Sequence, residues 1–142
     1  MSNTLKKIIN DEDIHHAGFN LAVAWGAGNV ANIISNSIFH FNLNEYNSVD
    51  HFAMGVGIGT LAYRKAGKGT KGILAGLITA TLFNTGWEDF ENKYVFYNKE
   101  LDIDTISDIG ILYAGTALSF LGEKSKDYIN RNKIKRNEKW VL

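Results

Sequence analysis

Residues 17–41 read AGFNLAVAWGAGNVANIISNSIFHF, and this stretch decides the predicted fold. At a rise of about 1.5 Å per residue, a helix of this length can cross the roughly 30 Å hydrocarbon layer of a membrane. Asn29, Asn32 and Asn36 recur at helical spacing, so their amides share one stripe, which we expect to face other helices. The stretch therefore predicts a first membrane-spanning helix that belongs to a bundle.

Three further apolar stretches follow, and short polar links separate them. We expect spans at about residues 46–63, 72–90 and 103–121, followed by a polar cytoplasmic tail over residues 122–142. Proline is absent and there are 14 glycines, a combination that favours helices in close contact. The sequence thus predicts one all-α domain over residues 1–142, a four-helix transmembrane bundle.

Small residues recur four apart in two of these stretches. Gly55 and Gly59 form a GxxxG pattern in the second span, and Gly72 and Gly76 are spaced in the same way in the third. In membranes, such glycines allow helix backbones to approach closely. We therefore expect the GxxxG faces to be able to hold together a homo-oligomer.

Basic residues are distributed unevenly among the links. Of the 15 lysines and arginines, all except Lys93 and Lys99 lie before the first span, between the second and third, or after the fourth. With four crossings these three regions share one side of the membrane, and a surplus of basic residues marks the cytoplasmic side. The pattern predicts a multi-pass protein of the cell membrane, in contact with membrane lipids, with both termini in the cytoplasm.

The composition excludes several functional classes. The absence of cysteine excludes disulfides, thiolate metal sites and cysteine nucleophiles. Basic and acidic residues balance at 15 each, so a nucleic-acid partner is not expected. The glycine-rich link at residues 66–72 lacks the spacing of a phosphate-binding loop. His15 and His16 adjoin an acidic run near the N-terminus, and we expect them to be solvated.

The outer ends of spans two to four collect carboxylates and one histidine. Six residues form this group: Asp50, His51, Glu88, Glu91, Asp104 and Asp108. Glu88 and Glu91 are three residues apart and Asp104 and Asp108 four apart, so each pair projects from one face of its helix. Such oxygen and nitrogen ligands suit a divalent metal ion such as Zn, Mn, Fe or Mg. Ionisable groups within a span are costly, which makes them candidates for function.

A simpler interpretation of the same residues stays open. Acidic residues at helix N-termini complement the helix dipole, which accounts for Asp50 and Asp104 without any ligand. Glu88 and Asp89 lie at a predicted helix C-terminus, where the dipole disfavours anions, so solvation beyond the membrane surface would have to accommodate them. The sequence leaves a shared polar or metal site and a set of solvated carboxylates as alternatives.

Three segments resemble a known family in their order and spacing. They are DHFAMGVGIG at 50–59, WEDFE at 87–91 and DTISDIGILYAGTALSFLG at 104–122, and they resemble the YjdF-like membrane proteins and, more distantly, the VanZ-like family. Glu91 stands where the VanZ-type E-x-x-Q pattern has glutamine, and Asp108 stands at an asparagine position, which favours the YjdF-like side. The resemblance implies a compact helical membrane protein with a role at the cell envelope, and it points to the same six residues.

Three functional hypotheses follow from the sequence. In the first, His51 and a carboxylate hold a metal ion, and Glu91 acts as a general base toward metal-bound water in a reaction on lipid or envelope precursors. In the second, the carboxylates bind cations or protons in a transporter-like or assembly role without catalysis. In the third, the four stretches are ordinary core helices of a soluble bundle.

Overall fold

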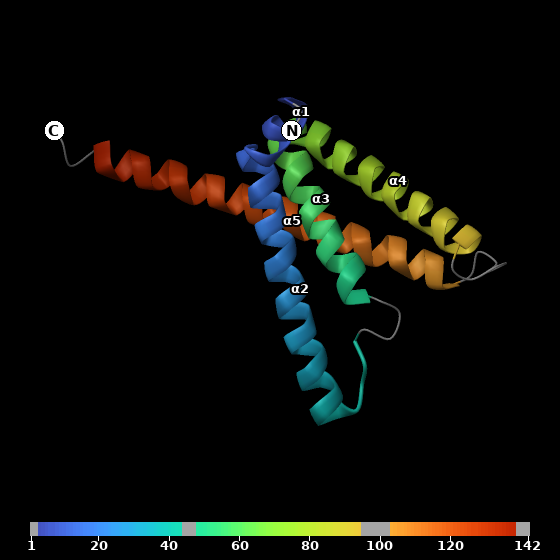
Figure 1. Cartoon of the computed structure of the whole chain (residues 1–142). Coiled ribbons are helices and arrows are strands. Elements are labelled where there is room, and N and C mark those ends of the chain that lie inside the picture. Colours follow the sequence, from blue (N-terminus) through green and yellow to red (C-terminus); the bar gives the residue numbers. More distant parts are fainter. Residues whose placement is uncertain (1–2, 44–47, 95–102, 139–142) are drawn as a thin grey trace.

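The computed structural model describes residues 3–43, 48–94 and 103–138, and all the regular structure in these ranges is helical. Its helices are α1 (Asn3–Ile9), α2 (Glu12–Phe39), α3 (Ser48–Ala66), α4 (Thr70–Tyr94) and α5 (Ile103–Glu138). The all-α expectation is therefore confirmed for the described part of the chain. α3 is the central helix, since α2, α4 and α5 all pack against it (Figure 1).

The first long helix begins earlier than the hydrophobic stretch that predicted it. The Asp11 side chain caps α2 by accepting hydrogen bonds from the backbone N–H groups of Asp13 at 3.0 Å and Ile14 at 3.3 Å. Glu12 and Asp13 then place negative charge in the first turn, where the helix dipole favours it. Because of these local contacts, α2 begins at Glu12 and includes the polar residues that precede residue 17.

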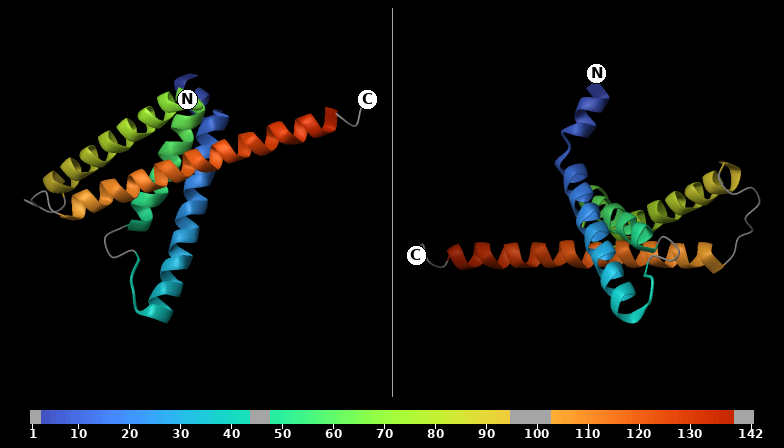
Figure 2. Two further views of the ribbon diagram at one scale, coloured as in Figure 1. Left: turned by 180° about the vertical axis from the view of Figure 1, so that it is seen from behind. Right: turned by 60° about the horizontal axis from the view of Figure 1, so that its bottom comes forward.

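The last helix is longer than the predicted fourth span. α5 continues from Ile103 to Glu138 without interruption, so the fourth stretch and most of the charged tail form one element. The tail is rich in lysine and contains no proline, so its composition allows the helix to continue. Figure 2 shows the C-terminal part of α5 projecting well beyond the other helices.

Glycines allow α3 and α5 to pack with their backbones in close contact. A Cβ atom at Gly55 would collide with the Leu112 carbonyl, and one at Gly59 would lie 2.7 Å from the Thr116 carbonyl oxygen. On the opposite helix, a Cβ atom at Gly115 would collide with the Phe52 carbonyl. The GxxxG face is thus covered by α5 of the same chain, and the predicted homo-oligomer would need a different surface.

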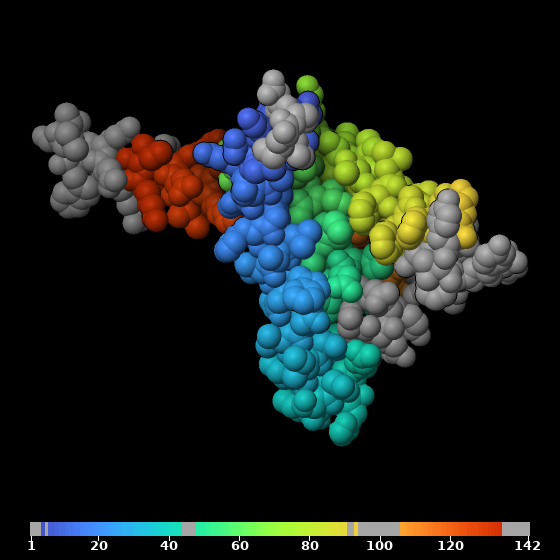
Figure 3. All heavy atoms as spheres, in the orientation of Figure 1, coloured from blue at the N-terminus to red at the C-terminus, as the bar shows by residue number. Residues whose placement is uncertain are grey.

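α2 packs on the other side of α3 over only part of its length. A Cβ atom at Gly28 would lie 2.7 Å from the Val49 side chain, and one at Gly57 would lie 2.9 Å from Leu21. The C-terminal part of α2 extends beyond the start of α3 (Figures 1 and 3). The asparagine stripe therefore faces the bundle only in part, since Asn29 is half-buried and Asn36 is exposed.

The outward faces of the peripheral helices carry large apolar side chains. The exposed ones include Phe19, Val23, Val30, Ile33, Ile38 and Phe39 on α2 and Ile73, Leu74, Ile78, Leu82 and Phe90 on α4. Within the described ranges, no helix combines the length and the apolarity required of a candidate membrane span.

Candidate functional site

Two of the predicted site residues meet at the end of the bundle that is formed by the start of α3, the end of α4 and the start of α5, which is the end that the sequence predicted to be the outer one. His51 Nδ1 on α3 lies 3.6 Å from Asp108 Oδ1 on α5, and only 12% of the histidine side chain and 8% of the aspartate side chain are exposed. The close packing of α3 on α5 brings these residues together from distant parts of the sequence. We call them the His51–Asp108 pair.

Asp50 is directed toward a different helix from its neighbour His51. Asp50 is exposed, and its Oδ1 accepts a hydrogen bond of 2.7 Å from the indole Nε1 of Trp25 on α2. Successive residues of a helix point about 100° apart, since one turn takes 3.6 residues. Asp50 therefore contributes to the α2–α3 contact, while His51 contributes to the α3–α5 contact.

The carboxylates at the end of α4 differ in their surroundings. Glu88 is half-buried. Asp89 is exposed and forms an ion pair of 2.7 Å with Lys93 one turn later in the same helix. Solvent and this lysine accommodate Asp89, so its position at a helix C-terminus requires no ligand.

The remaining predicted ligands, Glu91 and Asp104, have side chains outside the described part of the structure. Among the side chains that are described, no group of three or more histidine, aspartate or glutamate residues is arranged to hold a metal ion. The metal site therefore stays a prediction, with the His51–Asp108 pair as the part of it that the fold brings together.

A buried asparagine on α4 was not among the predicted site residues. Asn84 is 1% exposed, and neither atom of its amide has a hydrogen-bond partner within the described residues. It lies on the buried stripe of α4 that contains Gly72, Gly76 and Ala80, each four residues apart. That spacing, extended from the two glycines, was the signal in the sequence that could have identified Asn84.

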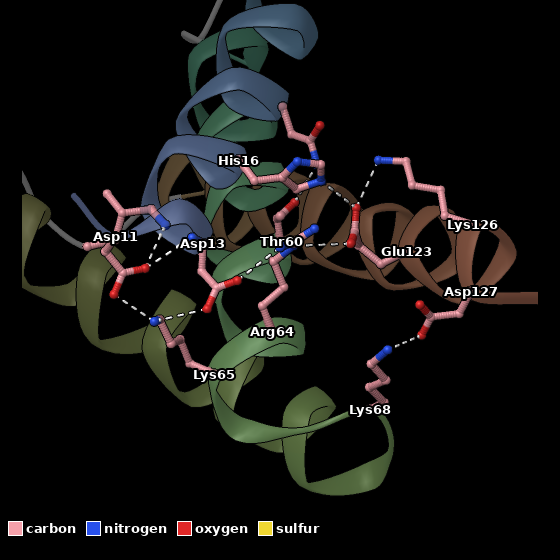
Figure 4. Close-up of polar contacts among 12 residues, drawn as sticks. Asp11, Asp13, His16, Thr60, Arg64, Lys65, Lys68, Glu123, Lys126 and Asp127 are labelled. Carbon is pink, nitrogen blue, oxygen red and sulfur yellow. Dashed lines mark hydrogen bonds and ion pairs between the residues drawn. The ribbon is translucent and has the colours of Figure 1, made fainter. Parts of the chain in front are cut away.

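A second polar region lies at the opposite end of the bundle, where the start of α2, the end of α3 and the middle of α5 meet (Figure 4). Lys65 Nζ lies 2.7 Å from Asp11 Oδ2 and 2.9 Å from Asp13 Oδ2. Arg64 Nη1 lies 2.9 Å from Asp13 Oδ1. We call the group Asp11, Asp13, His16, Arg64, Lys65, Glu123 and Lys126 the ion-pair cluster.

Glu123 is the buried member of the ion-pair cluster, and only 7% of its side chain is exposed. Its Oε1 lies 3.1 Å from His16 Nε2 and 2.9 Å from Lys126 Nζ, and its Oε2 lies 3.4 Å from Arg64 Nε. Burial disfavours the ionised carboxylate, but the hydrogen bonds from Lys126 and His16 outweigh it and hold the pKa of Glu123 below its usual value. The expectation that His16 is solvated is met only in part, because 30% of its side chain is exposed while its ring lies against this carboxylate of α5.

The aspartates of the ion-pair cluster are also held in their ionised form. Hydrogen bonds from Lys65 are the main cause that lowers the pKa of both Asp11 and Asp13. The acidic run near the N-terminus and the basic end of the second stretch were both visible in the sequence, on the same predicted side. Their complementary charges were the signal that could have indicated this contact.

Hydroxyl and amide groups connect the helices between these two ends. Thr60 Oγ1 accepts a hydrogen bond of 3.1 Å from Asn20 Nδ2 on α2 and lies 2.9 Å from Ser119 Oγ on α5. Thr116 Oγ1 lies 3.2 Å from the Gly55 carbonyl oxygen and 2.9 Å from that of Leu112. The buried hydroxyls of Thr60 and Thr116 are thus satisfied across the helix contacts around α3, in contrast to the amide of Asn84.

The chain matches no model of a known protein family. The searches of curated proteins and of solved structures likewise gave no significant match. The resemblance to YjdF-like and VanZ-like proteins therefore stays a prediction.

Proposed function

We propose that this chain is a small integral membrane protein that binds a divalent metal ion at the His51–Asp108 pair. The observation that carries the proposal is the largely buried contact of an imidazole with a carboxylate at the outer end of the bundle. Buried ionisable groups of this kind are costly, and they cluster at functional sites.

The separation of the two side chains is compatible with a shared metal ion. The 3.6 Å between His51 Nδ1 and Asp108 Oδ1 exceeds the length of an ordinary hydrogen bond. Two donors on a tetrahedral ion, each at about 2.1 Å from the metal, lie roughly 3.4 Å apart. A small movement of either side chain would therefore allow both to coordinate one ion.

The surface of the bundle supports a membrane location. Exposed apolar side chains cover the outward faces of α2 and α4. Extensive exposed apolar surfaces are typical of proteins that contact lipid or another protein. The ion-pair cluster lies at the end of the bundle where the charge distribution of the links predicts the cytoplasm.

A metal ion held by His51 and Asp108 would suit hydrolysis of lipid or envelope precursors. A divalent ion lowers the pKa of bound water and stabilises negative charge on the substrate. Glu88 or Glu91 at the end of α4 would serve as the general base toward that water. The second candidate function is the binding of cations or protons without catalysis. The burial of the His51–Asp108 pair supports this function as much as it supports hydrolysis.

Metal content tests the proposed site. We expect detergent-purified protein to contain a divalent metal ion, and we expect His51→Ala and Asp108→Asn each to lose most of it while keeping the helical circular dichroism spectrum. His15→Ala and Asp89→Asn are matched controls, because each removes the same type of group from an exposed position. Elemental analysis of the five proteins is the measurement. Equal metal content in the wild type and the two site variants would refute the proposal.

Membrane association has a separate test. We expect the chain to stay with the membrane fraction after an alkaline carbonate wash and to be released by detergent. Release as a monodisperse species without detergent would favour the soluble bundle instead. Hydrolysis assays on lipid-linked phosphate esters distinguish catalysis from cation or proton binding without catalysis. If the metal-loaded protein does not hydrolyse these esters, the result supports binding alone.

A further inference from the structure

We infer that Asn84 is a third ligand of the same site, and that it coordinates a divalent transition-metal ion through its amide oxygen. This inference rests on the proposed function, because it adds a ligand to the His51–Asp108 pair. It would bring one donor from each of the helices α3, α4 and α5 to a single ion.

The burial of Asn84 without a partner is the first observation. Its side chain is 1% exposed, and neither the nitrogen nor the oxygen of its amide forms a hydrogen bond with any described residue. Leaving a buried polar group without a hydrogen bond is unfavourable, and the great majority of such groups in proteins are satisfied. A bound ligand is a direct reason for an amide to be kept at this position.

The contacts between α4 and α5 fix the level of Asn84 along the bundle. A Cβ atom at Gly76 would lie 3.1 Å from Thr116 Cγ2, and Thr81 is hydrogen-bonded to Tyr113. Residue numbers thus rise along α4 as they fall along α5, so the two helices are antiparallel. One further turn beyond Thr81 brings Asn84 opposite Asp108.

The contacts of the same stripe with α3 show which helices the stripe faces. The Cβ position of Gly76 is also 3.4 Å from Ala62 on α3, so this stripe of α4 lies between α3 and α5. Asn84 is two turns further along the stripe, and it is buried like Gly76 and Ala80. Asn84 therefore lies on the stripe of α4 that faces α3 and α5, the two helices that carry His51 and Asp108.

The three donors together define the class of metal ion. An imidazole nitrogen favours Zn²⁺, Fe²⁺ and similar ions, while carboxylate and amide oxygens favour Mg²⁺, Ca²⁺ and Mn²⁺. A mixed set of one nitrogen and two oxygens suits Mn²⁺, Fe²⁺ or Zn²⁺ better than Ca²⁺. The amide is neutral, so Asp108 is the one described carboxylate among the three ligands, and it would neutralise only part of the charge of the divalent ion. The remaining positive charge would favour an anionic substrate.

The substitution Asn84→Leu tests this inference through two opposite effects. We expect it to weaken binding of Mn²⁺ and of Zn²⁺ at least about tenfold, as loss of a direct or supporting ligand does. We also expect the metal-free variant to melt at a higher temperature than the metal-free wild type, because a buried amide without a partner is removed. Mn²⁺ electron paramagnetic resonance, Zn²⁺ competition titration and thermal melting in detergent are the measurements.

Asn20→Leu is the matched control, because the amide of Asn20 is hydrogen-bonded to Thr60 and lies on α2. It should lower the melting temperature and leave the affinity for both metals unchanged. Asn84→Asp, which keeps an oxygen donor, should bind both ions at least as tightly as the wild type.

The outcomes separate this inference from the proposed function. If His51→Ala and Asp108→Asn lose the metal while Asn84→Leu keeps it, the role of Asn84 is wrong and the His51–Asp108 pair stands. If Asn84→Leu loses metal but also melts lower than the wild type without metal, the residue is structural and the inference fails. If the wild type binds neither ion, the inference is overturned, and if elemental analysis also finds no divalent metal ion in it, the proposed function is overturned as well.

Discussion

At Thr60, one hydroxyl group joins three helices. It lies within hydrogen-bond distance of Asn20 on α2, Ser119 on α5 and the Val56 carbonyl of its own helix. Thr60 is fully buried, so water cannot replace these contacts. A single polar atom at the centre of α3 therefore contributes to the relative positions of α2 and α5.

The substitution Thr60→Val tests this role, because it keeps the shape of the side chain and removes the hydroxyl. We expect a loss of roughly 1–3 kcal/mol in the free energy of unfolding, since the partly buried Asn20 amide and the buried Ser119 hydroxyl both lose a partner. Denaturant unfolding followed by circular dichroism measures the loss. Thr85→Val on the exposed side of α4 is the control and should change stability little. Equal stability of both variants would contradict the prediction.

Among the helices, α3 and α5 depend on glycine for their close contact. Gly115→Ala should cost roughly 1–3 kcal/mol, because its new methyl group would meet the Phe52 carbonyl and force the helices apart. Gly110→Ala is the matched control on the same helix, since nothing lies within 4 Å of its Cβ position. This control should be neutral or stabilising, because alanine favours a helix more than glycine does. The melting temperatures of the two variants are the measurement, and equal values would contradict the prediction.

The ion-pair cluster connects α2 and α5 to the end of α3. We expect its carboxylates to make the protein less stable in acid. The pKa values of Asp11, Asp13 and Glu123 lie below the usual values of 3.8 for aspartate and 4.5 for glutamate. A lowered pKa in the folded state adds stability above the unfolded value, and this contribution is lost as the pH falls through the folded value. We therefore expect the melting temperature to be steady near pH 6 and to fall below about pH 4.

The double substitution Arg64→Gln and Lys65→Gln checks the cause of that loss. It removes the partners that lower the pKa of Asp11 and Asp13, so the variant should be less stable at pH 6 and should lose less on acidification. Melting temperatures measured from pH 6 to pH 3 compare the two proteins. An equally steep acid loss in the variant would assign the effect to Glu123, whose partners Lys126 and His16 are unchanged, or to carboxylates outside the ion-pair cluster.

The whole molecule is an open arrangement in which two helices extend beyond the common core. The C-terminal part of α2 and the C-terminal part of α5 both project from it (Figures 1 and 2). Large exposed apolar side chains occur on both, including Phe39 on α2 and Ile129 on α5. Such an arrangement leaves much of the apolar surface of α2 and α4 uncovered by the chain itself, and lipid would cover it in the proposed membrane protein.

The proposed orientation in the membrane can be tested because the chain contains no cysteine. Single-cysteine variants Asn98→Cys and Ser125→Cys place a thiol in the predicted outer link and in the predicted cytoplasmic tail. In intact cells a membrane-impermeant maleimide should label the first and should label the second only after permeabilisation. The unsubstituted chain serves as the unlabelled control. The reverse pattern would invert the topology, and protection of both thiols until lysis would favour a cytosolic protein.

The candidate site was predictable in part. The sequence identified His51 and Asp108, because an ionisable residue near the end of an apolar stretch is conspicuous. It did not separate Asp50 from His51, because their different helix partners depend on how α3 is rotated between α2 and α5. It also missed Asn84, since the spacing from Gly72 and Gly76 indicates a shared stripe but does not reveal whether the buried amide has a partner.

The sequence by itself determined that the chain is helical and roughly where the helices lie, because these properties depend on local composition, spacing and capping residues such as Asp11. Only the tertiary structure decided which faces meet. The GxxxG face could have served a second copy, yet α5 of the same chain covers it. Glu123 looked like part of a solvated tail, yet it is buried against His16. Both outcomes depend on contacts between distant segments, whose register and rotation no local pattern specifies.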